Sequence, residues 1–135
     1  MKIKMSPAIS FKITTRMAIA IGILLPLAET IRRANQLLDP TLFFSWFDDY
    51  ILGGILLIAA WRALKNKMYS VSFLCAAWGI GVGALFLSFI GQFDYYKTAT
   101  GDPGIFATTF VAFVKGLILL YMMLGLWFGL RASRE

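Results

Sequence analysis

Four ionisable side chains lie within stretches of the chain that are otherwise apolar. Asp48 and Asp49 lie in WFDDYILGG, Glu29 in PLAETIRR and Lys115 in VAFVKGLIL. A charge at the centre of a bilayer costs about 2.5–3.5 kcal/mol, so such side chains usually face protein and pair with one another. We therefore expect these four residues to form a buried charge cluster, a candidate ion or ligand site.

Lys115 is the cation expected deepest in the membrane. Its candidate partners are Asp49, Glu29 and, less deeply placed, Asp48 and Asp94, and Asp49 is the partner expected for a buried pair. Asp49 stands seven residues into an apolar stretch that begins at Leu42, which is roughly 10 Å along a helix. One interpretation is a structural clamp that fixes the register of two helices. Two acids against one lysine leave a surplus carboxylate, which keeps a functional site open as the alternative.

Glu29 also has partners close by in the sequence. Arg32 and Arg33 follow it by three and four residues, the spacing at which side chains meet on one face of a helix. Local pairing of Glu29 with these arginines is the structural interpretation of that part of the cluster.

The missing residue types narrow the chemistry. The chain has no histidine, which removes the commonest metal ligand, the usual proximal haem ligand and the usual general base at neutral pH. A single cysteine, Cys75, excludes an intrachain disulfide and any site built from several thiolates. We expect no cofactor, no metal and no catalytic residue, so an enzyme acting on lipids ranks third among the functions considered.

Composition indicates a membrane protein. Hydrophobic residues make up 59% of the 135 residues, against roughly 45–50% in soluble domains. The formal net charge is +6, but the lysines and arginines cluster at the ends of apolar stretches. Because no basic stripe with interleaved aromatics is present, we expect lipid and not nucleic acid as the partner.

The elements that must hold these residues are four apolar helices. Each apolar stretch can supply the roughly 20 residues that a spanning helix needs. A capping side chain followed by proline precedes three of them, at Ser6-Pro7, Asp39-Pro40 and Asp102-Pro103. The predicted fold is an all-α integral membrane protein, a four-transmembrane-helix bundle forming one domain over residues 1–135. Its predicted helices cover residues 7–38, 40–65, 69–94 and 103–131.

The basic residues predict the orientation of the bundle. Nine fall on one side of the predicted spans, namely Lys2, Lys4, Lys12, Arg16, Arg62, Lys65, Lys67, Arg131 and Arg134. Three fall on the other side, namely Arg32, Arg33 and Lys97. The positive-inside rule therefore places both termini in the cytoplasm. The expected location is the inner (cytoplasmic) membrane of a bacterium, as a multi-pass protein.

Small residues recur at helical spacing on the last two predicted helices. They are Gly79 and Gly83 on the third, and Ala112, Gly116, Gly125 and Gly129 on the fourth. Small residues let helix backbones approach closely in lipid, so we expect these positions to pack against helices of this chain or of another subunit.

The leading functional hypothesis is a structural or accessory membrane subunit without catalytic machinery. It would pack through its glycine faces on itself or on a larger membrane complex. The alternative is a small ion- or proton-coupled carrier or channel protomer that uses Glu29, Asp48, Asp49 and Lys115.

Overall fold

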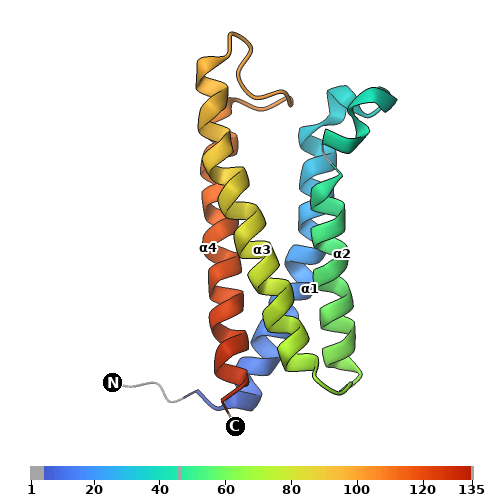
Figure 1. Cartoon of the computed structure of the whole chain (residues 1–135), viewed down its shortest axis with the longest axis vertical. Coiled ribbons are helices and arrows are strands. Elements are labelled where there is room, and N and C mark those ends of the chain that lie inside the picture. The colour runs from blue at the N-terminus through green and yellow to red at the C-terminus, as the bar shows by residue number, and fades with distance from the viewer. Residues whose placement is uncertain (1–4, 46, 135) are drawn as a thin grey trace.

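The structure, a computed structural model, describes residues 5–45 and 47–134, and these residues form helices and their connections without any strand. The long helices are α1 (Pro7–Arg32), α2 (Asp48–Leu64), α3 (Ser70–Gln92) and α4 (Thr108–Ala132). Three short 3-10 helices, η1 (Ala34–Gln36), η2 (Pro40–Ser45) and η3 (Phe93–Lys97), lie in the connections. The chain runs up and down, so its two ends lie together at one end of the bundle (Figure 1).

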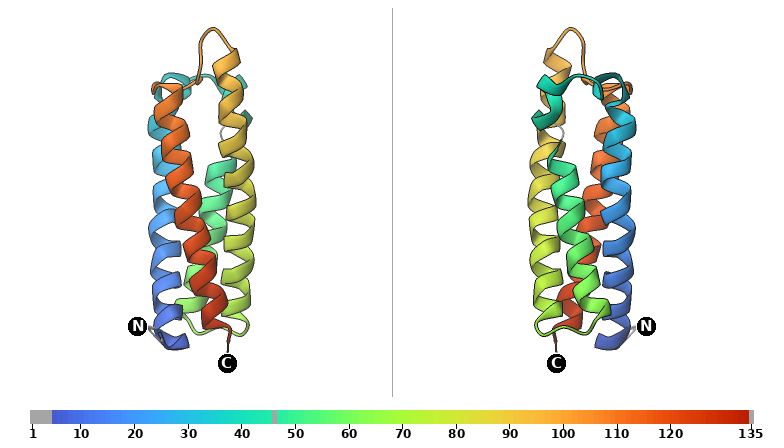
Figure 2. Two further views of the ribbon diagram at one scale, coloured as in Figure 1. Left: turned by 90° about the vertical axis from the view of Figure 1, so that its left-hand side faces the viewer. Right: turned by 90° about the vertical axis from the view of Figure 1, so that its right-hand side faces the viewer.

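Each long helix packs on the helices before and after it. The closest pairs are α1 with α2 and α3 with α4, and α1–α4 and α2–α3 contacts close the ring. The result is an antiparallel four-helix bundle with one short turn, between α2 and α3, at the end that holds the termini, and two longer connections at the opposite end (Figure 2). We call the end that holds the termini the inner end and the opposite end the outer end.

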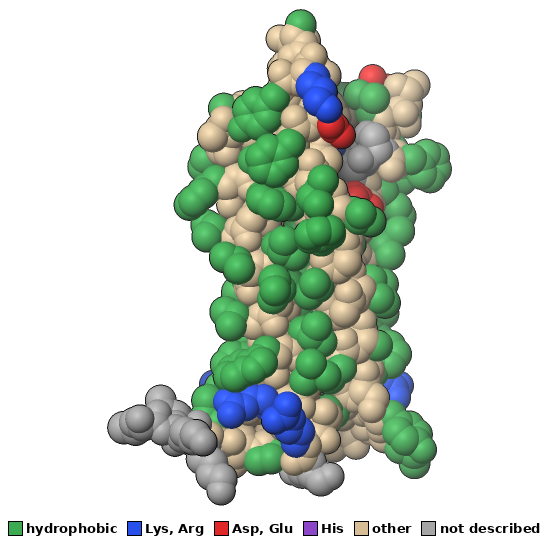
Figure 3. Space-filling model, turned by 60° about the vertical axis from the view of Figure 1, so that its left-hand side comes forward, with side chains coloured by type: hydrophobic (Ala, Val, Ile, Leu, Met, Phe, Trp, Pro, Cys, Tyr) green, Lys and Arg blue, Asp and Glu red, His purple; other side chains and the backbone are tan. Residues whose placement is uncertain are grey.

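Three of the four helices are long and apolar enough to cross a membrane: α1, the α3–η3 stretch Ser70–Lys97, and α4. Large apolar side chains stand exposed along these helices, and Figure 3 shows them over the length of one face, with lysines and arginines near the inner end. The remaining helix, α2, has 17 residues. At 1.5 Å per residue it reaches about 26 Å, less than the roughly 30 Å hydrocarbon core.

The predicted helix boundaries are wrong at the outer end. The first helix ends at Arg32 and not at residue 38, because Arg33 leaves the helical conformation with φ −98° and ψ 22°. Asp39 does act as a cap, and its carboxylate accepts a hydrogen bond from the Thr41 amide at 2.9 Å. The turn that it caps is η2, so the second helix begins at Asp48 and not at residue 40.

The second Asp-Pro motif, Asp102-Pro103, does not start a helix either. The Asp102 carboxylate turns to other partners, and the fourth helix begins at Thr108 instead of residue 103, after Ala107 and without a capping side chain. Ser6 does cap the first helix by accepting from the Ile9 amide at 3.4 Å, as predicted. The third helix, predicted over 69–94, covers Ser70–Gln92.

The later start of α2 changes the place of the two aspartates. Asp48 and Asp49 are the first two residues of α2, and Asp49 does not lie roughly 10 Å inside that helix as expected. Negative side chains are stabilised in the first turn, where unpaired amides and the helix dipole leave a partial positive charge. The start of the helix therefore accounts for acidic residues at this place in an apolar chain.

The inner half of the bundle is closed by a tryptophan. Trp78 is fully buried, and its Nε1 donates to Thr14 Oγ1 at 2.7 Å. The Thr14 hydroxyl in turn donates to the Gly125 carbonyl at 2.9 Å. A Cβ added at Gly125 would lie 2.5 Å from Cζ2 of Trp78, so the indole fits only against a glycine.

The other predicted packing positions divide into two groups. Ala112 is buried, Gly116 lies against the Phe89 ring, and Gly129 lies against the Cys75 thiol. A Cβ added at Gly79 or Gly83 would meet no atom within 4 Å. These two glycines therefore do not pack within the chain, because the face of α3 that carries them points out of the bundle.

Candidate functional site

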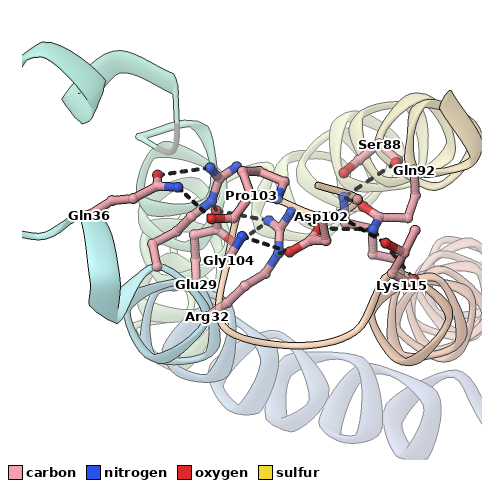
Figure 4. A network of polar contacts seen from close by, with 12 residues as sticks. Glu29, Arg32, Gln36, Ser88, Gln92, Asp102, Pro103, Gly104 and Lys115 are labelled. Atoms are coloured by element: carbon pink, nitrogen blue, oxygen red, sulfur yellow. Dashed lines mark hydrogen bonds and ion pairs between the residues drawn. The ribbon is translucent and has the colours of Figure 1, made fainter. Parts of the chain in front are cut away.

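The site lies at the outer end of the bundle and is organised by Arg32, at the end of α1. Its Nη1 donates to both carboxylate oxygens of Glu29, at 3.1 and 3.0 Å. Its Nη2 and Nε donate to the two oxygens of Asp102, at 2.6 and 3.3 Å. All three residues are buried, so one guanidinium holds two carboxylates away from solvent. Figure 4 shows Arg32 between them.

Glu29 has a second arginine partner. Arg33 Nε donates to Glu29 Oε1 at 2.9 Å, and Arg33 Nη1 donates to Gln36 Oε1 at 3.0 Å. The predicted local pairing of Glu29 with Arg32 and Arg33 is therefore confirmed. The negative charge of the Glu29 carboxylate is therefore balanced by the two arginines that follow it on α1.

The α3–α4 connection is tied down onto the end of α1. The Ile105 amide donates to the Arg32 carbonyl at 3.0 Å, and Gln36 Nε2 donates to the Pro103 carbonyl at 2.7 Å. Gly104 passes so close to the Arg32 carbonyl that a Cβ there would overlap it. These backbone contacts place Asp102 beside Arg32.

Asp102 is held as a carboxylate. Burial alone would raise its pKa, but hydrogen bonds from Arg32, Gln92 and the Gly104 amide outweigh burial and leave the pKa below its ordinary value. Sequence reasoning treated this residue only as a helix cap.

A second branch of the network runs from Asp102 to Lys115 through an amide. Gln92 is completely buried, and its Nε2 donates to Asp102 Oδ1 at 2.9 Å. Lys115 Nζ donates to Gln92 Oε1 at 2.8 Å and to the Ser88 carbonyl at 3.4 Å. The amide thus accepts from the cation and donates to the anion. Sequence reasoning missed Gln92, whose only signal was a lone amide at the end of an apolar run.

The expected ion pair between Asp49 and Lys115 is not formed among the residues that the structure describes. The physical reason is that Lys115 is satisfied on the side of α3, while Asp49 starts α2 across the bundle. The carboxylate of Asp49 has no hydrogen bond and no ion pair to any other described residue.

Two adjoining cavities separate Asp49 from Lys115. They have volumes of about 260 and 210 Å³. Both are lined by the same five residues, Glu29, Arg32, Asp49, Ser88 and Lys115. The smaller one, which we call the polar chamber, is completed by Arg33, Asp48, Gly91 and Tyr95. The larger one, the apolar lobe, is completed by apolar side chains of α1, α3 and α4 together with Phe106.

The structure brings the four predicted cluster residues to the lining of the polar chamber. They differ in their state there. Glu29 is buried and neutralised, Asp48 is exposed at the rim, and Asp49 and Lys115 face the cavity without a partner of opposite charge among the described residues. The arrangement offers the carboxylate of Asp49, a second carboxylate at the rim from Asp48, and the ammonium group of Lys115 to whatever occupies the space.

Among the described residues, no three Asp, Glu or Cys side chains gather in a way that could hold a metal ion. Comparison of the chain with protein-family models, with curated proteins and with solved structures finds no match. The charged cavity is therefore the basis on which a function can be assigned.

Proposed function

We propose that this protein is a non-catalytic membrane protein that binds a charged ligand in the polar chamber, and that it works as the protomer of a small carrier. The observation that carries this proposal is the pair of opposite charges, Asp49 and Lys115, which line the same space without contacting each other. Ionisable residues inside membrane bundles commonly mark the paths of ions and substrates.

A purely structural clamp is less well supported by this geometry. A clamp would bring Asp49 and Lys115 into contact and close the space between them. The clamp role belongs instead to Arg32, which joins α1 to the α3–α4 connection through Asp102. An enzyme is also less well supported, because the sequence has no histidine and, among the described residues, neither the Ser88 nor the Tyr95 hydroxyl is hydrogen-bonded to a base.

The accessibility of an introduced cysteine from each side of the membrane tests the proposed carrier function. In a Cys75→Ala background, Ser88→Cys puts a thiol at a residue that lines both cavities. We expect a charged, membrane-impermeant thiol reagent to modify it from the outer side in sealed vesicles and from the inner side in inverted ones. Leu56→Cys, fully buried on α2, is the matched control and should stay unmodified. Modification from one side only would still agree with a ligand-binding protein, but it would overturn the proposed carrier function. No modification from either side would overturn both.

We further propose that all four helices cross the cytoplasmic membrane of a bacterium, with both termini in the cytoplasm. This orientation is supported by the gathering of lysines and arginines near the inner end, where the termini lie. The short α2 can span by local thinning of the bilayer. A cytoplasm-active reporter fused after Arg134 should be active, and one inserted in the connection at residues 97–104 should be inactive. The reverse pattern would overturn this orientation.

A second candidate function, an accessory subunit, is favoured by the face of α3 that points out of the bundle. Ser72, Ala76, Gly79 and Gly83 are exposed there at helical spacing, and the two glycines leave open space above them. Such faces suit close contact with another helix, in a second copy or in a larger membrane complex. We expect Gly79→Leu and Gly83→Leu to lower the mass of the assembly in mild detergent without lowering the unfolding temperature of the chain. An unchanged mass would count against the subunit role.

A further inference from the structure

We infer that the joined cavities hold a zwitterionic lipid, with a phosphoethanolamine headgroup between Asp49 and Lys115 and an acyl chain along the seam between α1 and α4. This inference rests on the proposed function, because it names the ligand of the same chamber. Three features of the molecule lead to it: the charges left over in the chamber, the opposite sides of the chamber on which these charges lie, and an apolar track that leads away from it.

The leftover charges select a headgroup that carries both signs. Glu29, Arg32, Arg33 and Asp102 neutralise one another through direct ion pairs. Lys115 donates two of its three N–H groups to the neutral oxygens of Gln92 and Ser88, so neither contact supplies an opposite charge to its ammonium group. An anionic headgroup would bring its charge toward Asp49, and a cationic one would bring its charge toward Lys115. A zwitterion satisfies both side chains.

The two ends of the headgroup are oriented by the same residues. Asp48 is exposed at the chamber rim next to Asp49, so the acidic side of the chamber lies at the start of α2. The amine belongs on that side, and the phosphate belongs beside Lys115 on α4. A primary amine fits better than a quaternary one, because a carboxylate can accept its N–H donors. Quaternary ammonium groups are usually bound in aromatic cages, and among the described residues that line the chamber Tyr95 is the one aromatic side chain.

An apolar track for the acyl chain begins at the chamber. The apolar lobe shares five residues with the chamber and reaches Ile118 on α4. Ile118 also lines a further apolar cavity of about 270 Å³, whose other lining residues lie on α1 and α4 and include Ala20 and Tyr121. The lobe and this cavity together follow one seam, from Phe110 to Tyr121.

The length of this track matches one leaflet of a bilayer. From Phe110 to Tyr121 is 11 residues, or about 16 Å along α4. Half of the roughly 30 Å hydrocarbon core is about 15 Å. Ile31 and Phe110, which line the lobe, are 50% and 53% exposed, so the seam is open to lipid at its side. An acyl chain can therefore enter laterally while its headgroup remains in the chamber.

Native mass spectrometry tests the inference. The full-length protein is extracted in mild detergent from vesicles with equal amounts of phosphatidylethanolamine and phosphatidylglycerol, and the retained lipid is counted. We expect phosphatidylethanolamine to be retained about tenfold over phosphatidylglycerol. Lys115→Met and Asp49→Asn should each weaken its retention about tenfold or more, since each leaves a buried charge of the headgroup unpaired.

Matched controls come from the exposed ion pair Lys97–Asp94 at the same end of the bundle, with side chains 81% and 74% exposed. Lys97→Met and Asp94→Asn make the same chemical changes away from the cavity and should retain lipid like the parent. For the tail, Val114→Trp fills the apolar lobe and should reduce retention. Leu124→Trp, on the exposed face of α4, should not. If Lys115→Met does not fold, Val114→Trp and Asp49→Asn still test the site.

Several results would overturn the inference. Equal retention of the two lipids would contradict the preference for a zwitterionic headgroup. Cavity variants that retain lipid like their controls would show that the lipid binds elsewhere. Effective competition by equimolar, water-soluble glycerophosphoethanolamine would show that the acyl chain contributes nothing to binding. The inference that the ligand is a lipid would then be wrong. If phosphatidylglycerol or the soluble zwitterion binds in a way that depends on Asp49 and Lys115, the inference fails while the proposed function stands. If none of the three binds and Ser88→Cys is unreactive, both fail.

Discussion

The inner and outer halves of this bundle are built from the same four helices by opposite means. In the inner half, the fully buried Trp78 lies against Gly125, and one hydroxyl, that of Thr14, satisfies both the indole and a backbone carbonyl. In the outer half, charged side chains set the distances between elements and leave two cavities open. The inner half is closed by the fit of Trp78 against a glycine, and the outer half is joined by ion pairs that leave cavities between the helices.

The contrast explains how one small chain can be closely packed at one end and hollow at the other. Where a glycine faces a bulky side chain, the helices come together and no space remains. Where Arg32 holds both Glu29 and Asp102, the partners are fixed at hydrogen-bond distance by side chains, and α2 and α3 stand apart at this end of the bundle (Figure 1). Cavities in the outer half follow from the size of the groups that bridge it.

The largest expected effect is at Arg32. Arg32→Met removes the cation between two buried carboxylates, and breaking a buried pair of this kind costs about 3–5 kcal/mol. We expect a corresponding loss of stability in thermal unfolding of the detergent-solubilised protein. Lys97→Met breaks an exposed pair and should cost about 0–1 kcal/mol. Equal costs for the two variants would mean that the outer half does not depend on its charges.

The next effect is at Gly125, in the inner half. Gly125→Ala puts a Cβ 2.5 Å from the Trp78 ring, and overpacking of this kind costs about 1–3 kcal/mol. Gly79→Ala makes the same change on the open face of α3 and should stabilise the helix by up to about 1 kcal/mol. Opposite signs in the unfolding temperature are the expected result. The same sign for both would contradict the packing described for Trp78.

Acidification should loosen the outer half first. The pKa of Asp102 is lowered in the folded protein, so its contribution to stability is fully present above the ordinary value of 3.8. That contribution is lost as the pH falls through the folded pKa. We expect proteolysis at the α3–α4 connection to rise below about pH 3.8 in the parent. Asp102→Asn should already be cleaved at neutral pH and should change less with pH. Identical pH profiles would mean that Asp102 does not fasten the connection.

The sequence predicted local features better than assembled ones. The four helices, the Ser6 cap and the Glu29–Arg32–Arg33 pairing each depend on residues a few positions apart, and the structure contains them. Asp39-Pro40 and Asp102-Pro103 each predict a helix start, but the same dipeptide also begins a 3-10 turn, as at Asp39, or a bent connection, as at Asp102.

The polar network could not be predicted in the same way. Gln92, Asp102 and Lys115 come from α3, a connection and α4, and their contacts exist only after the helices have packed. Charge alone suggested that Lys115 pairs with Asp49, because an amide is not an obvious partner for a buried cation. The position of α2 decided the outcome, since a helix that starts at Asp48 keeps its carboxylates across the cavity.

The smallest expected effect is the coupling between Asp49 and Lys115, measured by a double-mutant cycle on thermal stability in lipid-free detergent. Lys115→Met and Gln92→Leu should be coupled by about 0.5–3 kcal/mol, because the two side chains are hydrogen-bonded. Lys115→Met and Asp49→Asn should add to within about 0.5 kcal/mol, because a cavity separates them. A stronger coupling with Asp49 than with Gln92 would mean that the cavity closes in solution and that the ion pair expected from the sequence forms there. Additivity in detergent, followed by coupling once phosphatidylethanolamine is added, would instead mean that the two charges communicate through a ligand.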